Sequence, residues 1–532
     1  MPYKIDTIFG LLVAVAALAW LARKISVPYP ILLVIGGLGL ALIPNLPRIR
    51  LEPDLVFLIF LPPLLYPAAL MTSWRDFRAN LRPIMLLAIG LVLFTTCSVG
   101  FLAHYFIPAL PLAGAFALGA IISPPDAVAS TAILERLRVP RRIATVIEGE
   151  SLVNDATALV AFAFAVDAMN TGMFSLAQAG IRFVEVSVGG VLIGLGIGWL
   201  AAQAQRRLDD PPVQITISIL TPYAAYLLAD QLMVSGVLAV VSAGMFLGWR
   251  APVIINSRMR LQAYPVWEMI VFLLNGLVFI LIGLQLPEVL QLISSKAMPT
   301  SHLVGYAILI SALVIVVRFI WVFAATYVPR WLSKSLCERD PPPSWREVTI
   351  VAWTGMRGVV SLAAALALPS MVLNATMAGG DLAVDLIIFF TFAVILVTLV
   401  LQGLTLPLLI RALKVVDGGE TEREEREARL KANLAAMARL MELEQKKKFG
   451  TDLLQHLRAE YEDRVRQLET IDEHEAHPAN RLFSTEYQDL QHDALQVERR
   501  TILQLRNERV INDHALRRIQ RDLDLAEARL HE

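Results

Sequence analysis

The chemistry in this sequence is concentrated in a group of acidic and oxygen-bearing side chains inside an otherwise apolar segment, residues 143–168. Glu150 and Asn154 are four residues apart, as are Ser151 and Asp155, so each pair stacks along one side of a helix. Hard cations take oxygen ligands, and an ionisable residue at membrane depth usually marks an ion or proton path. The spacing therefore predicts a site for a cation or a proton. In the alternative interpretation, these acids lie in a cytoplasmic loop that leads into a shorter helix.

A second segment, residues 111–133, contains Pro124 and Pro125 directly before Asp126. Two successive prolines remove two backbone donors and break a helix. Broken helices inside membranes present carbonyl groups and half-helix ends to ions. Asp126 would begin the second half-helix, where a carboxylate complements the positive helix end. The alternative is an ordinary proline kink that Asp126 merely caps.

Two arginines lie within apolar segments, Arg318 in residues 303–328 and Arg357 in residues 347–372. Each requires an acidic partner or a set of carbonyl groups. Glycines on both sides of Arg357 favour a second helix break, whose negative half-helix ends this arginine would compensate. The alternative for Arg357 is an arginine that extends to the membrane interface. Interruptions in both halves of the chain are typical of inverted repeats with a site at the membrane midplane.

The rest of the sequence describes the membrane scaffold that must position these residues. Apolar residues make up 56% of the 532 residues and charged residues 18%, against about 25% charged in a typical soluble protein. A bilayer is crossed by about 20 mainly apolar residues. About thirteen such segments are expected, at residues 5–22, 27–44, 54–72, 83–106, 111–133, 143–168, 180–203, 213–230, 232–249, 266–286, 303–328, 347–372 and 384–411. The expected fold is an all-α integral membrane protein with inverted repeats and two crossing broken helices.

The loops that follow the odd-numbered segments are rich in arginine and lysine, and the intervening loops are poor in them. Positively charged loops stay in the cytoplasm. We therefore expect an external N-terminus, a cytoplasmic C-terminus and a location in the plasma (inner) membrane. The formal net charge of zero gives no reason to expect a nucleic-acid partner.

The chain becomes highly charged after the last apolar segment, so residues 1–415 and 416–532 are predicted as a transmembrane domain and a cytoplasmic helical tail. One seven-residue repeat near the end favours a short coiled coil or a helix packed on a partner; it comprises Leu495, Ile502, Leu516, Leu523 and Leu530. We predict a regulatory tail, whose partner is unknown.

Residues 5–414 resemble the sodium/proton exchanger branch of the monovalent cation:proton antiporters, the NhaP-like and NHE-like transporters. The resemblance is carried by Glu150-Ser151-x-x-Asn154-Asp155, by the proline-broken helix with Asp126, and by Gly355-Met356-Arg357-Gly358. Two further stretches are similar, Leu61-Pro62-Pro63-Leu64-Leu65 and residues 279–287. The Asn154-Asp155 pair is the most specific of these elements.

The resemblance implies a homodimer that binds the ion where two broken helices cross. It implies that Asp155, beside Asn154, carries the ion or the proton, and that Ser151 and the segment around Asp126 complete the ion shell. It also implies that an arginine holds Glu150, for which Arg318 is the first choice and Arg357 the second. The family commonly has a threonine where this chain has Pro125, so Ser123 or bare carbonyl groups are expected to substitute for its hydroxyl.

The expected function is therefore secondary antiport of Na⁺, or of Li⁺ or K⁺, against protons. One exchangeable charge at Asp155 favours electroneutral exchange. No enzymatic activity and no cofactor are expected. The alternatives are a K⁺/H⁺ antiporter on the same scaffold, a cation channel, for which the sequence lacks a filter-like repeat, and a membrane-anchored signalling protein.

Overall fold

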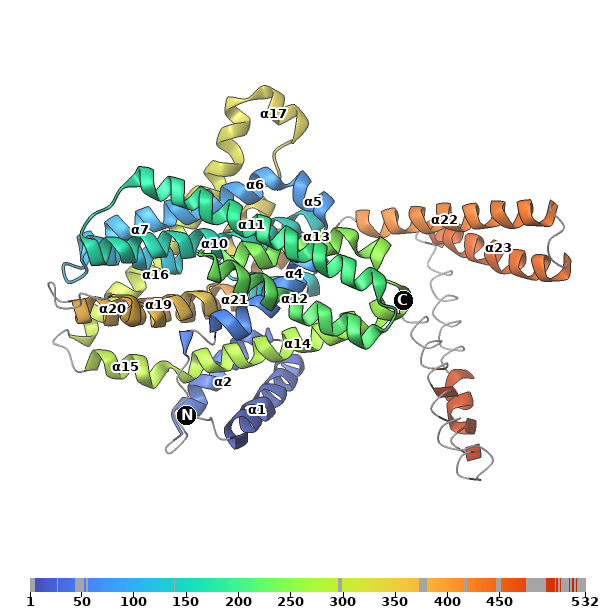
Figure 1. Cartoon of the computed structure of the whole chain (residues 1–532), viewed down its shortest axis with the longest axis horizontal. Helices are drawn as coiled ribbons and strands as arrows, with labels where there is room; N and C mark the ends of the chain where they lie inside the picture. Colours follow the sequence, from blue (N-terminus) through green and yellow to red (C-terminus); the bar gives the residue numbers. More distant parts are fainter. Residues whose placement is uncertain are drawn as a thin grey trace. The chain divides into compact units, whose positions relative to one another are not determined.

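The computed structural model describes residues 5–25, 27–43, 52–53, 56–137, 139–294, 299–372, 380–415, 417, 419–445, 451–474, 494–502 and scattered positions from 504 to 523. These residues are helical apart from turns and short connections, and none of them forms a strand. The all-α prediction is confirmed. The chain divides into two compact units, Met1–Asp417 and Gly418–Glu532, each of which is described separately below (Figure 1).

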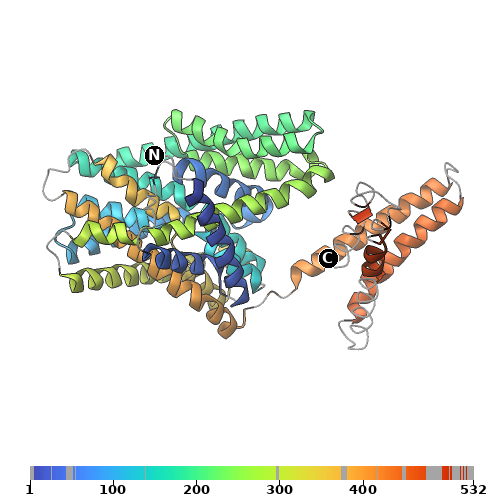
Figure 2. The ribbon, with the colours of Figure 1, turned by 90° about the horizontal axis from the view of Figure 1, so that it is seen from below.

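The first unit is a layered bundle of helices (Figures 1 and 2). Eight of its described helical segments are long and apolar enough to cross a membrane, and four shorter helices are also apolar. Its elements are α1 (Ile5–Lys24), α2 (Tyr29–Ala41), η1 (Val56–Phe60), α4 (Leu61–Met71), α5 (Trp74–Ala79), α6 (Leu81–Met85), η2 (Leu86–Leu91), α7 (Val92–Phe106), α8 (Leu112–Ile122), α9 (Ala127–Arg136), α10 (Arg141–Thr171), α11 (Leu176–Arg207), α12 (Pro211–Gln231), α13 (Gly236–Ile254), α14 (Ser257–Leu284), α15 (Leu286–Ser294), α16 (Thr300–Leu332), α17 (Lys334–Arg339), α18 (Trp345–Trp353), α19 (Val359–Met371), α20 (Gly380–Val397), η3 (Thr398–Gln402) and α21 (Gly403–Leu413). Every segment expected to span the membrane overlaps one of these helices, while the count of thirteen spans remains a prediction.

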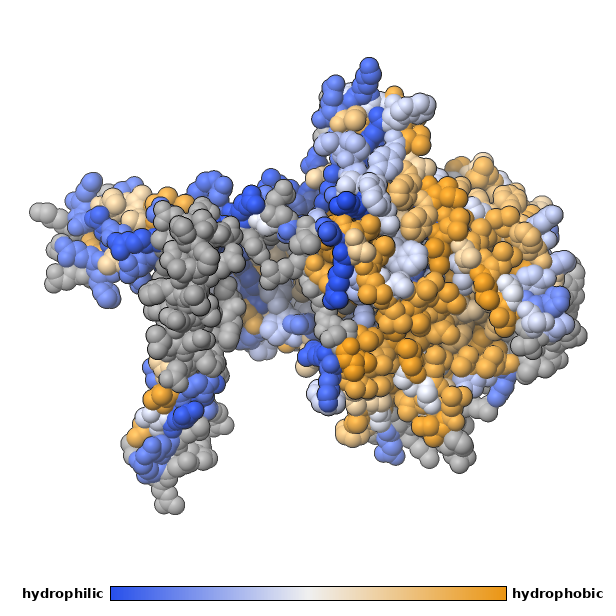
Figure 3. Space-filling model, turned by 180° about the vertical axis from the view of Figure 1, so that it is seen from behind, coloured by the Kyte–Doolittle hydropathy of each residue, from blue (hydrophilic) through white to orange (hydrophobic). Residues whose placement is uncertain are grey.

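The outside of this unit is apolar. Figure 3 shows a broad hydrophobic area on one face, bordered by hydrophilic residues at its edges. Apolar side chains of α11 are exposed as well: Val184, Val188 and Leu192 are 58%, 51% and 64% exposed. Contiguous apolar surface of this extent is costly in water but matches the hydrocarbon core of a bilayer. The surface thus agrees with a multi-pass membrane protein.

The buried side chains form two main hydrophobic clusters. The first takes most of its side chains from α8, α10, α14, α19 and α20. The second takes most from α4, α11, α12 and α13. Within the second cluster, Gly190, Gly194 and Gly198 place one bare side of α11 against the backbone of α13. Small residues spaced by four allow membrane helices to approach closely and to gain van der Waals contact.

The second unit contains α22 (Glu420–Gln445) and α23 (Thr451–His474), which lie side by side (Figures 1 and 2). Exposed ion pairs such as Arg429–Glu425 follow the (i, i+4) spacing of a solvated helix. Further along, Ile502, Leu516 and Leu523 form a small hydrophobic cluster against which Leu495 packs. These are members of the predicted seven-residue repeat, whose last member, Leu530, lies outside the described residues.

Candidate functional site

Both segments that the sequence predicts to be broken are interrupted in the middle of the first unit. The α8 helix ends at Ile122 and α9 begins at Ala127, because Pro124 and Pro125 supply no backbone donor. The α18 helix ends at Trp353 and α19 begins at Val359. Four half-helix ends, each with unsatisfied backbone groups, are thereby brought into the protein interior.

The two interruptions contact each other directly. The backbone N–H of Asp126 donates to the carbonyl of Met356 over 2.7 Å. A side chain on Gly358 would collide with the Asp126 carboxylate. Glycine at position 358 leaves room for the Asp126 side chain, because a Cβ atom there would overlap it.

Charged groups compensate the half-helix ends at this crossing. Asp126 Oδ1 accepts from the N–H of Val128 over 2.8 Å and caps the positive end of α9. Arg357 Nε donates to the carbonyl of Ile122 at the negative end of α8 over 3.0 Å, and Nη1 donates to the carbonyl of Gly355. Arg357 is only 1% exposed, so the alternative of an arginine that extends to the interface is wrong. The alternative of a simple kink at Asp126 is also wrong, because the helix stops and restarts.

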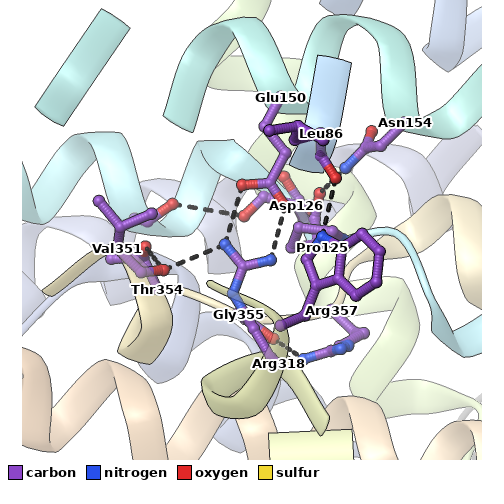
Figure 4. A network of polar contacts seen from close by, with 12 residues as sticks. Leu86, Pro125, Asp126, Glu150, Asn154, Arg318, Val351, Thr354, Gly355 and Arg357 are labelled. Carbon is purple, nitrogen blue, oxygen red and sulfur yellow. Dashed lines mark hydrogen bonds and ion pairs between the residues drawn. The ribbon is translucent and has the colours of Figure 1, made fainter. Parts of the chain in front are cut away.

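The α10 helix carries the predicted binding residues past this crossing. It runs unbroken from Arg141 to Thr171, and Asn154 and Asp155 are 0% and 7% exposed within it. The alternative of surface acids on a loop is therefore wrong for this pair. Asn154 Nδ2 donates to the carbonyl of Pro125 over 3.0 Å, which fixes α10 to the first interruption (Figure 4).

Glu150 lies one turn before Asn154 and forms a two-pronged ion pair with Arg318 of α16. The distances are 2.6 Å from Nη1 to Oε1 and 2.9 Å from Nη2 to Oε2, and the side chains are 0% and 1% exposed. Arg318 Nη2 also donates to the carbonyl of Val351 in α18 over 3.1 Å. The geometry selects Arg318, rather than Arg357, as the partner of Glu150, and the pair joins three helices around the crossing (Figure 4).

A cavity of about 370 Å³ reaches Asp155 and Asp126. Ser151 also lines it, on the same side of α10 as Asp155, which is the arrangement predicted from their spacing. Ser123 does not line it; this residue is 1% exposed and its hydroxyl donates to the carbonyl of Ala120 over 2.8 Å. Of the two predicted substitutes for the missing threonine hydroxyl, the geometry favours bare carbonyl groups over Ser123.

Several polar residues at the site were missed by sequence analysis. Asn275 of α14, Thr131 of α9 and Ser361 of α19 line the cavity, and Thr398 accepts the backbone N–H of Arg357 over 3.2 Å. Asn275 and Thr398 are isolated polar residues within long apolar segments. That signal was available, although the sequence alone does not show which side of a helix faces the site.

The profile of the transmembrane domain of sodium/hydrogen exchangers matches residues 10–412. The chain belongs to the sodium/hydrogen exchanger family. It is 35% identical to an uncharacterized Na⁺/H⁺ exchanger of Mycobacterium tuberculosis, over 98% of this chain and 96% of the relative. It is 37% identical to a sodium, potassium, lithium and rubidium/H⁺ antiporter of Bacillus subtilis, over 72% of this chain and 58% of the relative.

The fold of this exchanger also matches a solved structure. The sodium proton antiporter MjNhaP1 of Methanocaldococcus jannaschii aligns with a TM-score of 0.60 at 20% identity, covering 76% of this chain and 98% of that chain. The family identity and the antiporter fold support a transporter rather than an enzyme. The interrupted helices and the buried ion pair therefore belong to an antiporter fold.

Proposed function

We propose that this exchanger moves one Na⁺ against one proton and that Asp155 is the residue both ions occupy in turn. The observation that carries the proposal is the position of Asp155: it is a buried carboxylate that lines a cavity beside two interrupted helices. A buried carboxylate is costly unless a proton or a cation neutralises it. Competition between the two ions for one carboxylate is sufficient for exchange.

The charges around Asp155 support a stoichiometry of one to one. Glu150 is neutralised by Arg318, and Asp126 caps the positive end of α9. Asn154 is neutral. Of Asp126, Glu150 and Asp155, only Asp155 therefore carries a negative charge that is free to exchange. The loaded site is then neutral with either ion, and an unloaded carboxylate would be costly to move through the barrier.

The proposed cation shell combines side-chain and backbone oxygens. Asp155 and Ser151 supply oxygens from α10, and Asp126 and the carbonyl groups of the interrupted segment supply the rest. Such all-oxygen shells suit hard cations. They do not by themselves separate Na⁺ from K⁺ or Li⁺, and the name of the Bacillus subtilis relative includes all three. Exchange of K⁺ on the same scaffold is therefore the second candidate.

The cavity reaches from Asp155 along α10 to Glu148 and along α4 to Met71. These ends of α4 and α10 adjoin loops that are rich in arginine. If those loops are cytoplasmic, as the positive-inside rule indicates, the structure represents an exchanger open to the cytoplasm. We also propose a homodimer in the plasma (inner) membrane with an external N-terminus, and a regulatory role for the helical tail.

The direct experiment is Asp155→Asn in proteoliposomes with a preformed proton gradient. The amide cannot release a proton or balance the cation, so Na⁺, Li⁺ and K⁺ should all fail to dissipate the gradient. Asp167→Asn, at an exposed aspartate on the same helix, is the matched control and should exchange normally. Substantial exchange by correctly inserted Asp155→Asn protein would refute the assignment.

Stoichiometry requires a separate experiment. With the vesicle potential clamped by potassium and valinomycin, Na⁺-driven proton flux should be nearly unchanged, provided that K⁺ is not itself a substrate. A transporter that moved net charge would gain or lose about 2.3 kcal/mol per charge at 100 mV. Strong voltage dependence would therefore contradict electroneutral exchange and would make Asp126 the first candidate for a second proton carrier.

A further inference from the structure

A second cavity, of about 760 Å³, lies apart from the ion site between α7, α8, α10 and α11. Its walls include Thr96, Cys97, Phe101, Phe116, Ala161 and Gly180. None of its described lining residues is charged. Strongly exposed side chains form part of its wall, so the space opens to the outside of the membrane unit and is filled from its surroundings.

Water does not suit this cavity. A buried water molecule needs two to four polar partners, and apolar cavities otherwise stay dry. The hydroxyl groups in the wall are already used within their own helices: Thr96 donates to the carbonyl of Val92 over 2.8 Å, and Thr157 donates to that of Val153 over 3.3 Å. The remaining wall is almost entirely hydrocarbon, including the edge-to-face pair of Phe101 and Phe116 at 5.2 Å. An unsolvated ion is excluded for the same reason.

The surroundings of the cavity indicate what fills it. Its wall includes side chains that are also on the outside of the membrane unit, such as Phe101, Phe174 and Leu176, which are 60%, 63% and 79% exposed. In a membrane this surface adjoins lipid tails. Lipid tails are as apolar as leucine, so a lipid acyl chain gains nothing from the hydrophobic effect when it enters the cavity. It does gain the dispersion contacts that the walls would lose around a void.

We propose that this cavity is a binding site for an acyl chain of a membrane phospholipid. The site extends along α7 from Leu93 to Phe101 and lies beside the start of α8 and the connection from α10 to α11. These parts of α8, α10 and α11 are in the external half of the bilayer under the orientation proposed above. The site is walled on one side by helices of the first hydrophobic cluster and on the other by α11 of the second. The acyl chain thus occupies space between the helices that carry the ion site and the helices that pack around α11. Binding does not depend on the proposed exchange.

The glycines of α11 provide a matched pair of variants. A Cβ atom at Gly180 meets nothing within 4 Å, and Gly180 lines the cavity. A Cβ atom at Gly196, on the same helix, also meets nothing within 4 Å, but Gly196 does not line the cavity. Gly180→Leu should therefore fill part of the site, whereas Gly196→Leu makes the same chemical change outside it.

The test is photolabelling of the full-length protein in vesicles that contain a phosphatidylcholine with a diazirine on one acyl chain. Mass spectrometry should find adducts on lining residues of α10 and α11, together with general labelling of the lipid-facing side of α11. Gly180→Leu should lower labelling of the lining residues about tenfold, which corresponds to about 1.4 kcal/mol, and Gly196→Leu should not. Ala161→Leu fills the same space from α10 and should repeat the result if Gly180→Leu fails to fold.

Equal labelling of the lining residues in both glycine variants would overturn the proposal. So would unlabelled lining residues beside a labelled lipid-facing surface, because that pattern would mean that a second copy of the chain fills the cavity. Cys97 provides the remaining check, since Cys97 and Cys337 are the only two cysteines. In Cys337→Ser protein, Cys97 should react far more slowly with a charged, water-soluble thiol reagent than Cys337 does in Cys97→Ser protein. Comparable rates would show a water-filled vestibule and would also overturn the proposal.

Discussion

The ion pair between Glu150 and Arg318 allows a quantitative prediction about the stability of the site. Replacing Arg318 with Met keeps much of the side-chain volume but leaves the Glu150 carboxylate buried without its two charged hydrogen bonds. Removing one partner of a buried pair typically costs about 3–5 kcal/mol. Glu150→Met likewise leaves the Arg318 guanidinium buried without its charged partner and should lower stability by a similar amount.

The double variant, Glu150→Met with Arg318→Met, should be much less damaging than the two single changes together. It leaves no buried charge from this pair, and buried pairs replaced by apolar residues are often neutral in stability. The carbonyl of Val351 loses its bond from Arg318 but keeps one from Thr354 Oγ1 at 2.9 Å. We therefore expect the double variant to fall short of the summed single effects by at least about 3 kcal/mol.

Denaturant titration in detergent micelles, comparing the apparent free energy of unfolding for all four proteins, measures this coupling. The control is Glu185→Met, which breaks a pair with Arg182 whose side chains are 58% and 50% exposed and should change stability by no more than about 1 kcal/mol. Additive effects of the two single variants would refute the reasoning, because they would show that neither charge depends on the other.

Three further predictions concern the crossing, the loop that carries Asp340 and the topology. Gly358→Ala should place a methyl group against the Asp126 carboxylate, lower stability by about 1–3 kcal/mol and reduce exchange activity. The control Gly39→Ala, where a Cβ atom meets nothing within 4 Å, should have little effect. Normal exchange by Gly358→Ala would contradict the close approach. Burial alone raises the pKa of Asp340, but hydrogen bonds and charge from Arg142, at 2.6 Å, and Arg330, at 2.5 Å, outweigh it and lower that pKa from 3.8. The charged Asp340 therefore stabilises the fold above its unfolded-state pKa, and this contribution is lost as the pH falls through the lower folded-state pKa. Asp340→Asn should have a lower melting temperature than the unchanged protein at pH 7, and the two melting temperatures should converge in acid. A constant difference down to low pH would show that the charge is not responsible. Reporter fusions at Glu420 should be active on the cytoplasmic side, and an external reporter would reverse the proposed orientation.

The sequence alone determines features of this protein that arise from local physics. Apolar segments of sufficient length predict membrane helices, because an unsatisfied backbone is too costly in lipid. Two adjacent prolines predict the interruption before Asp126, because they lack donors wherever they are placed. The spacing of Ser151 and Asp155 predicts that they share one side of α10, because helix geometry fixes that side.

Only the tertiary structure decides which of these local features come together. The sequence offers two buried arginines as candidate partners of Glu150. The packing of α16 beside α10 brings Arg318 to 2.6 Å from Glu150, whereas Arg357 binds the end of α8. Ser123 was one of the two predicted substitutes for the family's threonine hydroxyl, yet its hydroxyl donates back to the carbonyl of Ala120 at the end of α8. Gly358 meets Asp126, and Asn154 meets Pro125, only because two interrupted helices and α10 converge at one place. These contacts join residues far apart in the chain, and they depend on how whole helices pack, which no local pattern of residues specifies.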